Sequence, residues 1–131
     1  MLPRIVVGIV VDADTPAFLQ KLTSMLVLEF DVVATAADGK AAFELIRRSK
    51  PDAVVFDLRT PVLCGIEIAR ELAQHSPRVV ICSWETSADV VEAALEAGAS
   101  GYVFKQRLGK DLILAVKTAI QGKRFVSPGS R

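Results

Sequence analysis

Acidic, hydroxyl and amine side chains stand at or just after the ends of the apolar runs in this sequence. They are Asp12, Asp14, Asp57, Ser83 and Lys105. Two carboxylates about 4 Å apart repel by roughly 4 kcal/mol at an effective dielectric near 20, so a cluster of them needs a cation, a raised pKa or a positive neighbour. An oxygen-only ligand set with few protein members suits Mg²⁺, which keeps several waters and favours a phosphate.

The remaining groups fit the same chemistry. Lys105 supplies a movable positive charge, and Ser83 supplies a hydrogen-bond donor for a phosphoryl oxygen. Asp57 is then a candidate carboxylate nucleophile that forms an aspartyl-phosphate. The residue types therefore indicate phosphoryl transfer to a carboxylate.

These side chains can act together only if the chain brings the ends of its apolar runs to one place. Five short apolar runs alternate with five helical segments, which predicts an α/β fold with a doubly wound five-stranded parallel sheet and helices on both faces. In such folds the functional crevice lies beyond the carboxyl ends of the strands. The strands are expected at 5–11, 31–35, 53–56, 79–82 and 102–104, and the helices near Pro16, Asp38, Ile66, Thr86 and Asp111.

Several ordered motifs then resemble response-regulator receiver domains. The segment 54–61, VVFDLRTP, followed by Gly65, looks like the phosphoacceptor segment of that family. Ser83, the run 93–99 and the run 101–105 match its later motifs in order. The ending 119–128 is similar to the NarL/FixJ-type subgroup. The resemblance covers essentially the whole chain.

The resemblance implies a flavodoxin-like, CheY-like receiver over residues 1–122 and a tail or linker over 123–131. A histidine kinase or a small phosphodonor would phosphorylate Asp57 with Mg²⁺ bound, and Ser83 and Lys105 would contact the phosphoryl group. Such a domain is no enzyme beyond slow self-dephosphorylation. In the subgroup a helix-turn-helix output domain usually follows, which would make the whole protein a transcriptional regulator, and dimerisation is plausible.

The first acidic site departs from the family pattern. The family has two adjacent acids shortly before a proline, and counting back from Pro16 places Asp14 on one of them and Ala13 on the other. Asp12 lies one residue early, and in an extended strand it would share a face with Asp14. We expect Asp14 and Asp57 to be metal ligands and Asp12 to be a possible substitute. The alternative role for Asp14 is a helix N-cap.

Four further residues are candidates for switching and tuning. By resemblance, Tyr102 would be the aromatic that couples the site to the partner surface, although it can equally be a packing residue. Trp84 stands where the family usually has a small residue, so it either slows phosphotransfer or hydrolysis or is an interface aromatic. Arg59 and Glu85 have opposite charge, so they either pair across the mouth of the site or are two solvated charges.

Two other functions compete with the receiver interpretation. A degenerate receiver-like module would act through partners without phosphorylation, because Ala13 and Trp84 are irregular. The segment 12–15, DADT, also has the Asp-x-Asp form of haloacid-dehalogenase-like phosphatases, but no later acidic pair would complete that metal site.

Composition sets outer limits on function. The chain has 131 residues, with 16 lysines and arginines against 15 acids and a net charge of +1. This balance disfavours direct nucleic-acid binding by the domain. The apolar stretch 5–11 is too short to cross a membrane. Cys64 and Cys82 are too few for a disulfide framework, which favours a reduced, cytoplasmic setting.

Overall fold

The computed structural model describes residues 5–10, 16–36, 39–58, 62–75 and 77–129. Asp12, Asp14, Asp38 and Arg59 therefore lie outside the described residues. The elements are, in chain order, β1 (Val6–Val10), α1 (Pro16–Leu26), β2 (Asp31–Ala36), α2 (Gly39–Ser49), β3 (Ala53–Asp57), α3 (Val62–Ala73), β4 (Arg78–Ser83), α4 (Ala88–Glu96), β5 (Gly101–Phe104), the 3₁₀ turn η1 (Lys105–Arg107), α5 (Leu108–Ile120) and β6 (Phe125–Val126).

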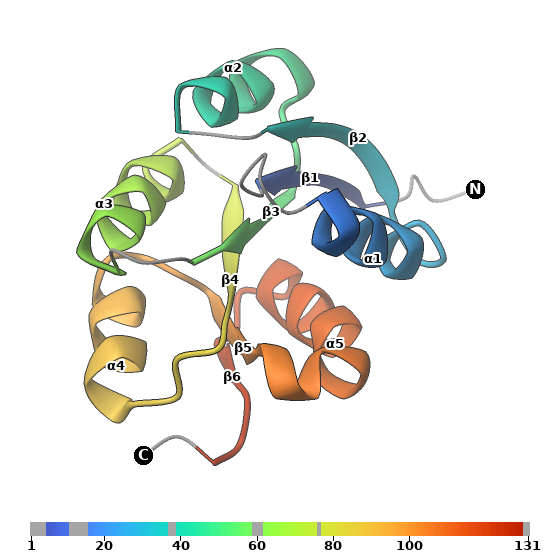
Figure 1. Ribbon diagram of the computed structural model, residues 1–131. Coiled ribbons are helices and arrows are strands. Elements are labelled where there is room, and N and C mark those ends of the chain that lie inside the picture. Colours follow the sequence, from blue (N-terminus) through green and yellow to red (C-terminus); the bar gives the residue numbers. More distant parts are fainter. Residues whose placement is uncertain (1–4, 11–15, 37–38, 59–61, 76, 130–131) are drawn as a thin grey trace.

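All strands are parallel and form one sheet in the order β2-β1-β3-β4-β5-β6. Helices α1 and α5 cover one face, and α2, α3 and α4 cover the other (Figure 1). From the neighbouring strands β1 and β3 the chain extends the sheet in two directions, to β2 on one side and to β4, β5 and β6 on the other, as in a doubly wound sheet. The predicted α/β class is confirmed, but the predicted five strands were one too few.

The missing strand is β6, at the edge beside β5. After α5 the chain reverses at Gly122, whose φ of +81° lies in the left-handed region that glycine adopts without a steric penalty. Phe125 and Val126 then pair with Gly101 and Tyr102. A two-residue strand carries no alternation that a sequence pattern can reveal, which is why the segment was expected to be tail.

Each face of the sheet has its own buried core. One core joins β-strand side chains to α1 and α5 and contains Leu22, Leu26, Leu112 and Val116. The other joins the opposite face to α2, α3 and α4 and contains Leu45, Leu72 and Val91 among its members. The apolar runs of β3 and β4 are buried on both faces, as central parallel strands require.

Helix α3 begins at Val62, earlier than the expected Ile66. Gly65, which directly precedes the expected start at Ile66, therefore lies within this helix. A Cβ at Gly65 would collide with the side chain of Leu58, so the glycine allows the helix to approach the end of β3 closely. Helix α5 also begins earlier than expected, at Leu108 and not at Asp111. None of the helices in the described ranges is long and apolar enough to span a membrane.

Candidate functional site

The parallel sheet brings three of the predicted side chains together at the carboxyl ends of its strands, which we call its carboxyl edge. Asp57 is the last residue of β3, Ser83 is the last of β4, and Lys105 directly follows β5. Asp57 pairs in register with Cys82, the residue before Ser83. Three chain segments that are far apart in sequence thus meet at the carboxyl ends of three neighbouring strands.

Asp57 and Lys105 form a buried ion pair. Lys105 Nζ lies 2.6 Å from Asp57 Oδ1, and the two side chains are 8% and 0% exposed, respectively. The ammonium also lies 4.3 Å from the centroid of the Phe18 ring, at the start of α1. A cation over an aromatic face gains electrostatic attraction, so Phe18 helps to hold the lysine in place.

The carboxylate of Asp57 has unused hydrogen-bonding capacity. Both of its oxygens are buried; Oδ1 is taken by the ammonium of Lys105, and Oδ2 has no hydrogen-bond partner among the described residues. Buried polar oxygens are nearly always satisfied, and an unsatisfied one is a recognised sign of an ion or a reacting group. A hard, oxygen-seeking cation such as Mg²⁺ fits this carboxylate.

Ser83 lies in the same buried edge. Its residue is 3% exposed, and its Oγ accepts a hydrogen bond of 3.0 Å from the backbone N–H of Glu85. A hydroxyl can donate one hydrogen bond while it accepts another, and the hydroxyl of Tyr102 lies within reach of the Ser83 hydrogen. The site thus has an anion, a cation and a neutral donor on neighbouring strands.

Tyr102 is fully buried beneath the loop that follows β4. Its hydroxyl donates a 2.8 Å hydrogen bond to the backbone carbonyl of Glu85, and its ring meets that of Phe104 edge to face at 5.8 Å. Burial raises the pKa of the Tyr102 hydroxyl, although the hydroxyl of Ser83 acts in the opposite direction. Tyr102 therefore ties β5 to the loop that leaves β4.

Two of the three remaining tuning candidates, Trp84 and Glu85, lie on that loop. Trp84 is 64% exposed, so its ring is largely in solvent. The carbonyl of Trp84 accepts a 3.4 Å hydrogen bond from the side chain of Gln106, in the turn after β5. Glu85 is exposed. Arg59 lies outside the described residues, so the pairing expected between Arg59 and Glu85 stays a prediction.

Cys82 is a buried core residue beside the ion pair. Burial and, to a smaller degree, the charge of Asp57 raise the pKa of its thiol to about 12, against the opposing effect of the charge of Lys105. The thiol therefore stays protonated and unreactive at neutral pH.

The first acidic site cannot be placed beside these groups, because Asp12 and Asp14 lie outside the described residues. Within the described ranges, no three histidine, cysteine or acidic side chains come together as a metal-ligating group. Of the predicted ligands, the structure places only Asp57.

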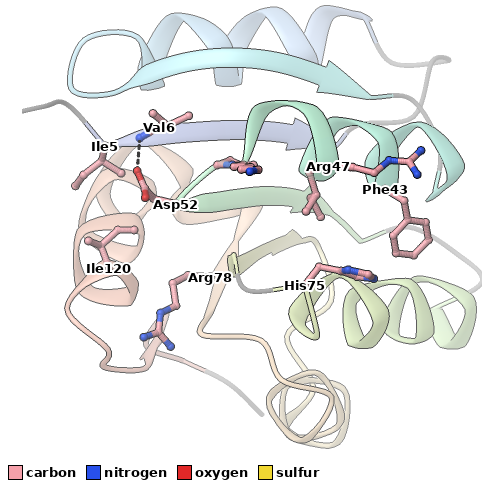
Figure 2. A pocket seen from close by; sticks show the side chains of 11 residues that line it. Ile5, Val6, Phe43, Arg47, Asp52, His75, Arg78 and Ile120 are labelled. Carbon is pink, nitrogen blue, oxygen red and sulfur yellow. Dashed lines mark hydrogen bonds between the residues drawn. The ribbon is translucent and has the colours of Figure 1, made fainter.

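A hollow lies at the opposite, amino edge of the sheet. It has a volume of about 1170 Å³, and Figure 2 shows Ile5 and Ile120 toward one end of it and Phe43 and His75 toward the other. Asp52 points into this region and accepts a 2.8 Å hydrogen bond from the backbone N–H of Val6. Neither Asp57 nor Lys105 lines it, so this hollow is separate from the candidate site.

Sequence reasoning missed one residue of the site. Phe18 lies two residues after Pro16, where the sequence predicts only the start of a helix, and its ring contacts the ammonium of Lys105. An aromatic in the first turn after strand β1 was the available signal, because the fold brings that turn to the carboxyl edge of the sheet.

The fold and the site define a class: a doubly wound parallel domain with a buried carboxylate–lysine pair at the carboxyl edge of its sheet. Residues 9–117 match the family model described as the response regulator receiver domain, so the chain belongs to that family. It is a receiver domain of two-component response regulators, and the family match favours this function over the phosphatase alternative.

Individual relatives agree with the assignment. The chain is 34% identical over 126 residues to the transcriptional regulatory protein DegU of Brevibacillus brevis, covering 93% of this chain and 53% of DegU. It is 32% identical to the probable transcriptional regulatory protein NarL of Mycobacterium tuberculosis, covering 93% of this chain and 58% of that protein. The chain thus spans a little over half the length of these curated relatives.

Solved structures agree as well. A LuxR-family response regulator from an Aurantimonas species superposes with a TM-score of 0.81 at 33% identity, covering 95% of this chain and 91% of that one. The signal receiver domain of NarL from Mycobacterium tuberculosis has a TM-score of 0.81 at 28% identity, covering 93% of this chain and all of that domain.

Proposed function

We propose that Asp57 is the phosphoacceptor of this receiver domain. The observation that carries the proposal is the state of its carboxylate. The side chain is wholly buried, Oδ1 faces the ammonium of Lys105 at 2.6 Å, and Oδ2 has no hydrogen-bond partner among the described residues. Free lone pairs on a buried carboxylate are what a nucleophile offers to phosphorus.

In the proposed reaction an Asp57 oxygen attacks the phosphorus atom, and the leaving group of the donor departs with the electron pair of the broken bond. Lys105 then pairs with a phosphoryl oxygen, which its flexible stem allows, and the hydroxyl hydrogen of Ser83 is donated to another. Asp57, together with Asp14 and with Asp12 as a possible substitute, would hold Mg²⁺. When bound, Mg²⁺ neutralises the negative charge that the carboxylates and the phosphate bring together.

We further propose that the loop after β4 reports the state of the site. Ser83 accepts from the N–H of Glu85, and Tyr102 donates to the carbonyl of the same residue. If Ser83 turns toward a phosphoryl oxygen, the loop must adjust at Glu85, and the partner of Tyr102 changes with it. Trp84, Glu85 and Arg59 would tune the lifetime of the phosphoryl group.

The donor and the output follow from the family. A sensor histidine kinase or a small phosphodonor would supply the phosphoryl group, and self-dephosphorylation would at most be slow. Because the curated relatives are nearly twice as long and are transcriptional regulators, we propose a helix-turn-helix output domain C-terminal to the receiver. The receiver itself would not bind nucleic acid, and its active form would be a homodimer.

The test is incubation with acetyl phosphate and Mg²⁺, followed by intact-mass measurement. We expect a mass gain of one phosphoryl group that is stable in acid and lost in base. Asp57→Asn should abolish the gain, and Asp89→Asn, which alters an exposed acid on α4, should retain it. An unmodified wild-type chain under excess donor would favour the module that acts without phosphorylation, and labelling of Asp57→Asn would place the acceptor elsewhere.

A further inference from the structure

The last described segment is fastened to the sheet by a buried serine. Ser127, directly after β6, is 1% exposed, and its backbone N–H donates a 2.9 Å hydrogen bond to the carbonyl of Tyr102. Its hydroxyl donates to Asp111 Oδ2 at 2.7 Å and accepts from the N–H of Phe104 at 3.1 Å. The hydroxyl of Ser127 thus satisfies the backbone N–H of Phe104, the last residue of β5.

Asp111, in the first turn of α5, completes the arrangement. It is 4% exposed, and the same Oδ2 accepts a 2.8 Å hydrogen bond from Arg107 Nε, with which it also forms an ion pair. We call Asp111, Ser127 and the N–H of Phe104 the clasp. A buried network with every member bonded is rigid, and losing one member leaves the others unsatisfied.

The clasp lies one residue from the candidate site. Phe104 immediately precedes Lys105, where strand geometry changes to the 3₁₀ turn η1, and Lys105 Nζ is 2.6 Å from Asp57 Oδ1. Fixing the N–H of Phe104 fixes the backbone from which the lysine extends. The bond from Ser127 N–H also fixes Tyr102, the other β5 residue with a contact near the site.

We propose that Asp111 and Ser127 are positioning residues for the phosphoacceptor reaction. By holding the end of β5 they set Lys105 on Asp57, and the same bonds couple the site to the segment through which the chain continues. This inference rests on the proposed function of Asp57. Because coupling between two sites is reciprocal, a phosphoryl group on Asp57 strengthens the docking of residues 125–127.

The first test measures binding of beryllofluoride, a phosphoryl analogue, with Mg²⁺. The single tryptophan, Trp84, directly follows Ser83 and serves as the fluorescent reporter. We expect Ser127→Ala to weaken binding at least threefold and Ser127→Thr, which keeps the hydroxyl, to restore it to within twofold. Thr23→Val removes a comparable hydroxyl bond, to the carbonyl of Leu19 in α1, and should leave the affinity unchanged.

Hydrogen exchange tests the reciprocal direction. Beryllofluoride at saturation should slow exchange of the Ser127 amide at least threefold in the wild-type chain. Binding by Ser127→Ala within twofold of wild type, or an unchanged Ser127 exchange rate, would overturn the proposal. If Ser127→Ala does not fold, Asp111→Asn takes its place in the same comparison.

A second measurement separates failure of the clasp from failure of the proposed function. If wild type binds no beryllofluoride and takes no phosphoryl group, the role of Asp57 fails first. The clasp is then judged by unfolding equilibria of Ser127→Ala, Lys105→Met and the double variant. If the clasp positions Lys105, the change in the unfolding equilibrium constant of the double variant differs at least fivefold from the product of the two single-variant changes. If it equals that product, the clasp does not act on Lys105.

Discussion

Replacing Lys105 with methionine should be costly, because it strands a buried charge. At 2.6 Å the attraction between Lys105 and Asp57 is about 6 kcal/mol at an effective dielectric near 20, and desolvation offsets much of it. Removing one partner of a buried pair costs about 3–5 kcal/mol, since the other charge stays behind. We expect Lys105→Met to lower the free energy of unfolding by about 3 kcal/mol.

The reverse substitution should cost much less. In Asp57→Asn the stranded group is the ammonium, which is 8% exposed and keeps its contact with the ring of Phe18. A lysine stem can also carry its charge outward to water. We therefore expect Asp57→Asn to cost less than about 1 kcal/mol, and the double variant to recover most of the loss of Lys105→Met.

Urea unfolding followed by circular dichroism, at pH 7 and with EDTA present, measures all three variants. Lys40→Met, which removes an exposed lysine of α2, is the matched control and should fall within about 0.5 kcal/mol of wild type. A domain of this size has about 5–15 kcal/mol of stability, so the variants should remain folded. The reasoning is refuted if Lys105→Met costs no more than the control, or if the two single effects simply add.

Two further outcomes follow from the same structure. Trp84→Ala should speed both labelling by acetyl phosphate and decay of the adduct several-fold, and equal rates would refute a restricting role; stability should change by about 0.5 kcal/mol or less, because the ring is exposed. Burial raises the pKa of Asp111, but the hydrogen bonds from Arg107 and Ser127 outweigh it and hold that pKa below its usual value of 3.8. A carboxyl with a lowered folded-state pKa stabilises the protein above its unfolded pKa, near 4, and this contribution is lost as the pH falls through the folded value. Asp111→Asn should therefore be about 1–2 kcal/mol less stable than wild type at pH 6, and this difference should begin to narrow below about pH 4; a difference at pH 3 equal to that at pH 6, measured by urea unfolding, would contradict this.

Much of the fold was predictable because its signals are local. The runs that became β3 and β4 are apolar at every central position, which marks strands covered on both faces. Pro16 begins α1 as its preset φ predicts. Ser87 caps α4 through a bond from Val90 N–H, in the segment whose sequence has a capping form.

The boundaries that failed depend on contacts distant in sequence. Gly65 reads as a loop residue, and only the nearby side chain of Leu58 explains a glycine within α3. Phe125 and Val126 read as tail, and only the free edge of β5 makes them a strand. In both cases the deciding partner is on another element, where a local pattern carries no information.

The same division runs through the site. The sequence by itself determined which groups could do chemistry: an acid, a hydroxyl and an amine, each at the end of an apolar run, which parallel strands must bring to one edge. Only the tertiary structure decided their relations. It put Lys105 against Asp57 with no other hydrogen-bond partner for that carboxylate among the described residues, placed Phe18 beside the ammonium, and joined Ser127 to Asp111. The physical reason is that residue type sets what a group can donate or accept, whereas burial and distance, which arise only when elements pack, set what it does.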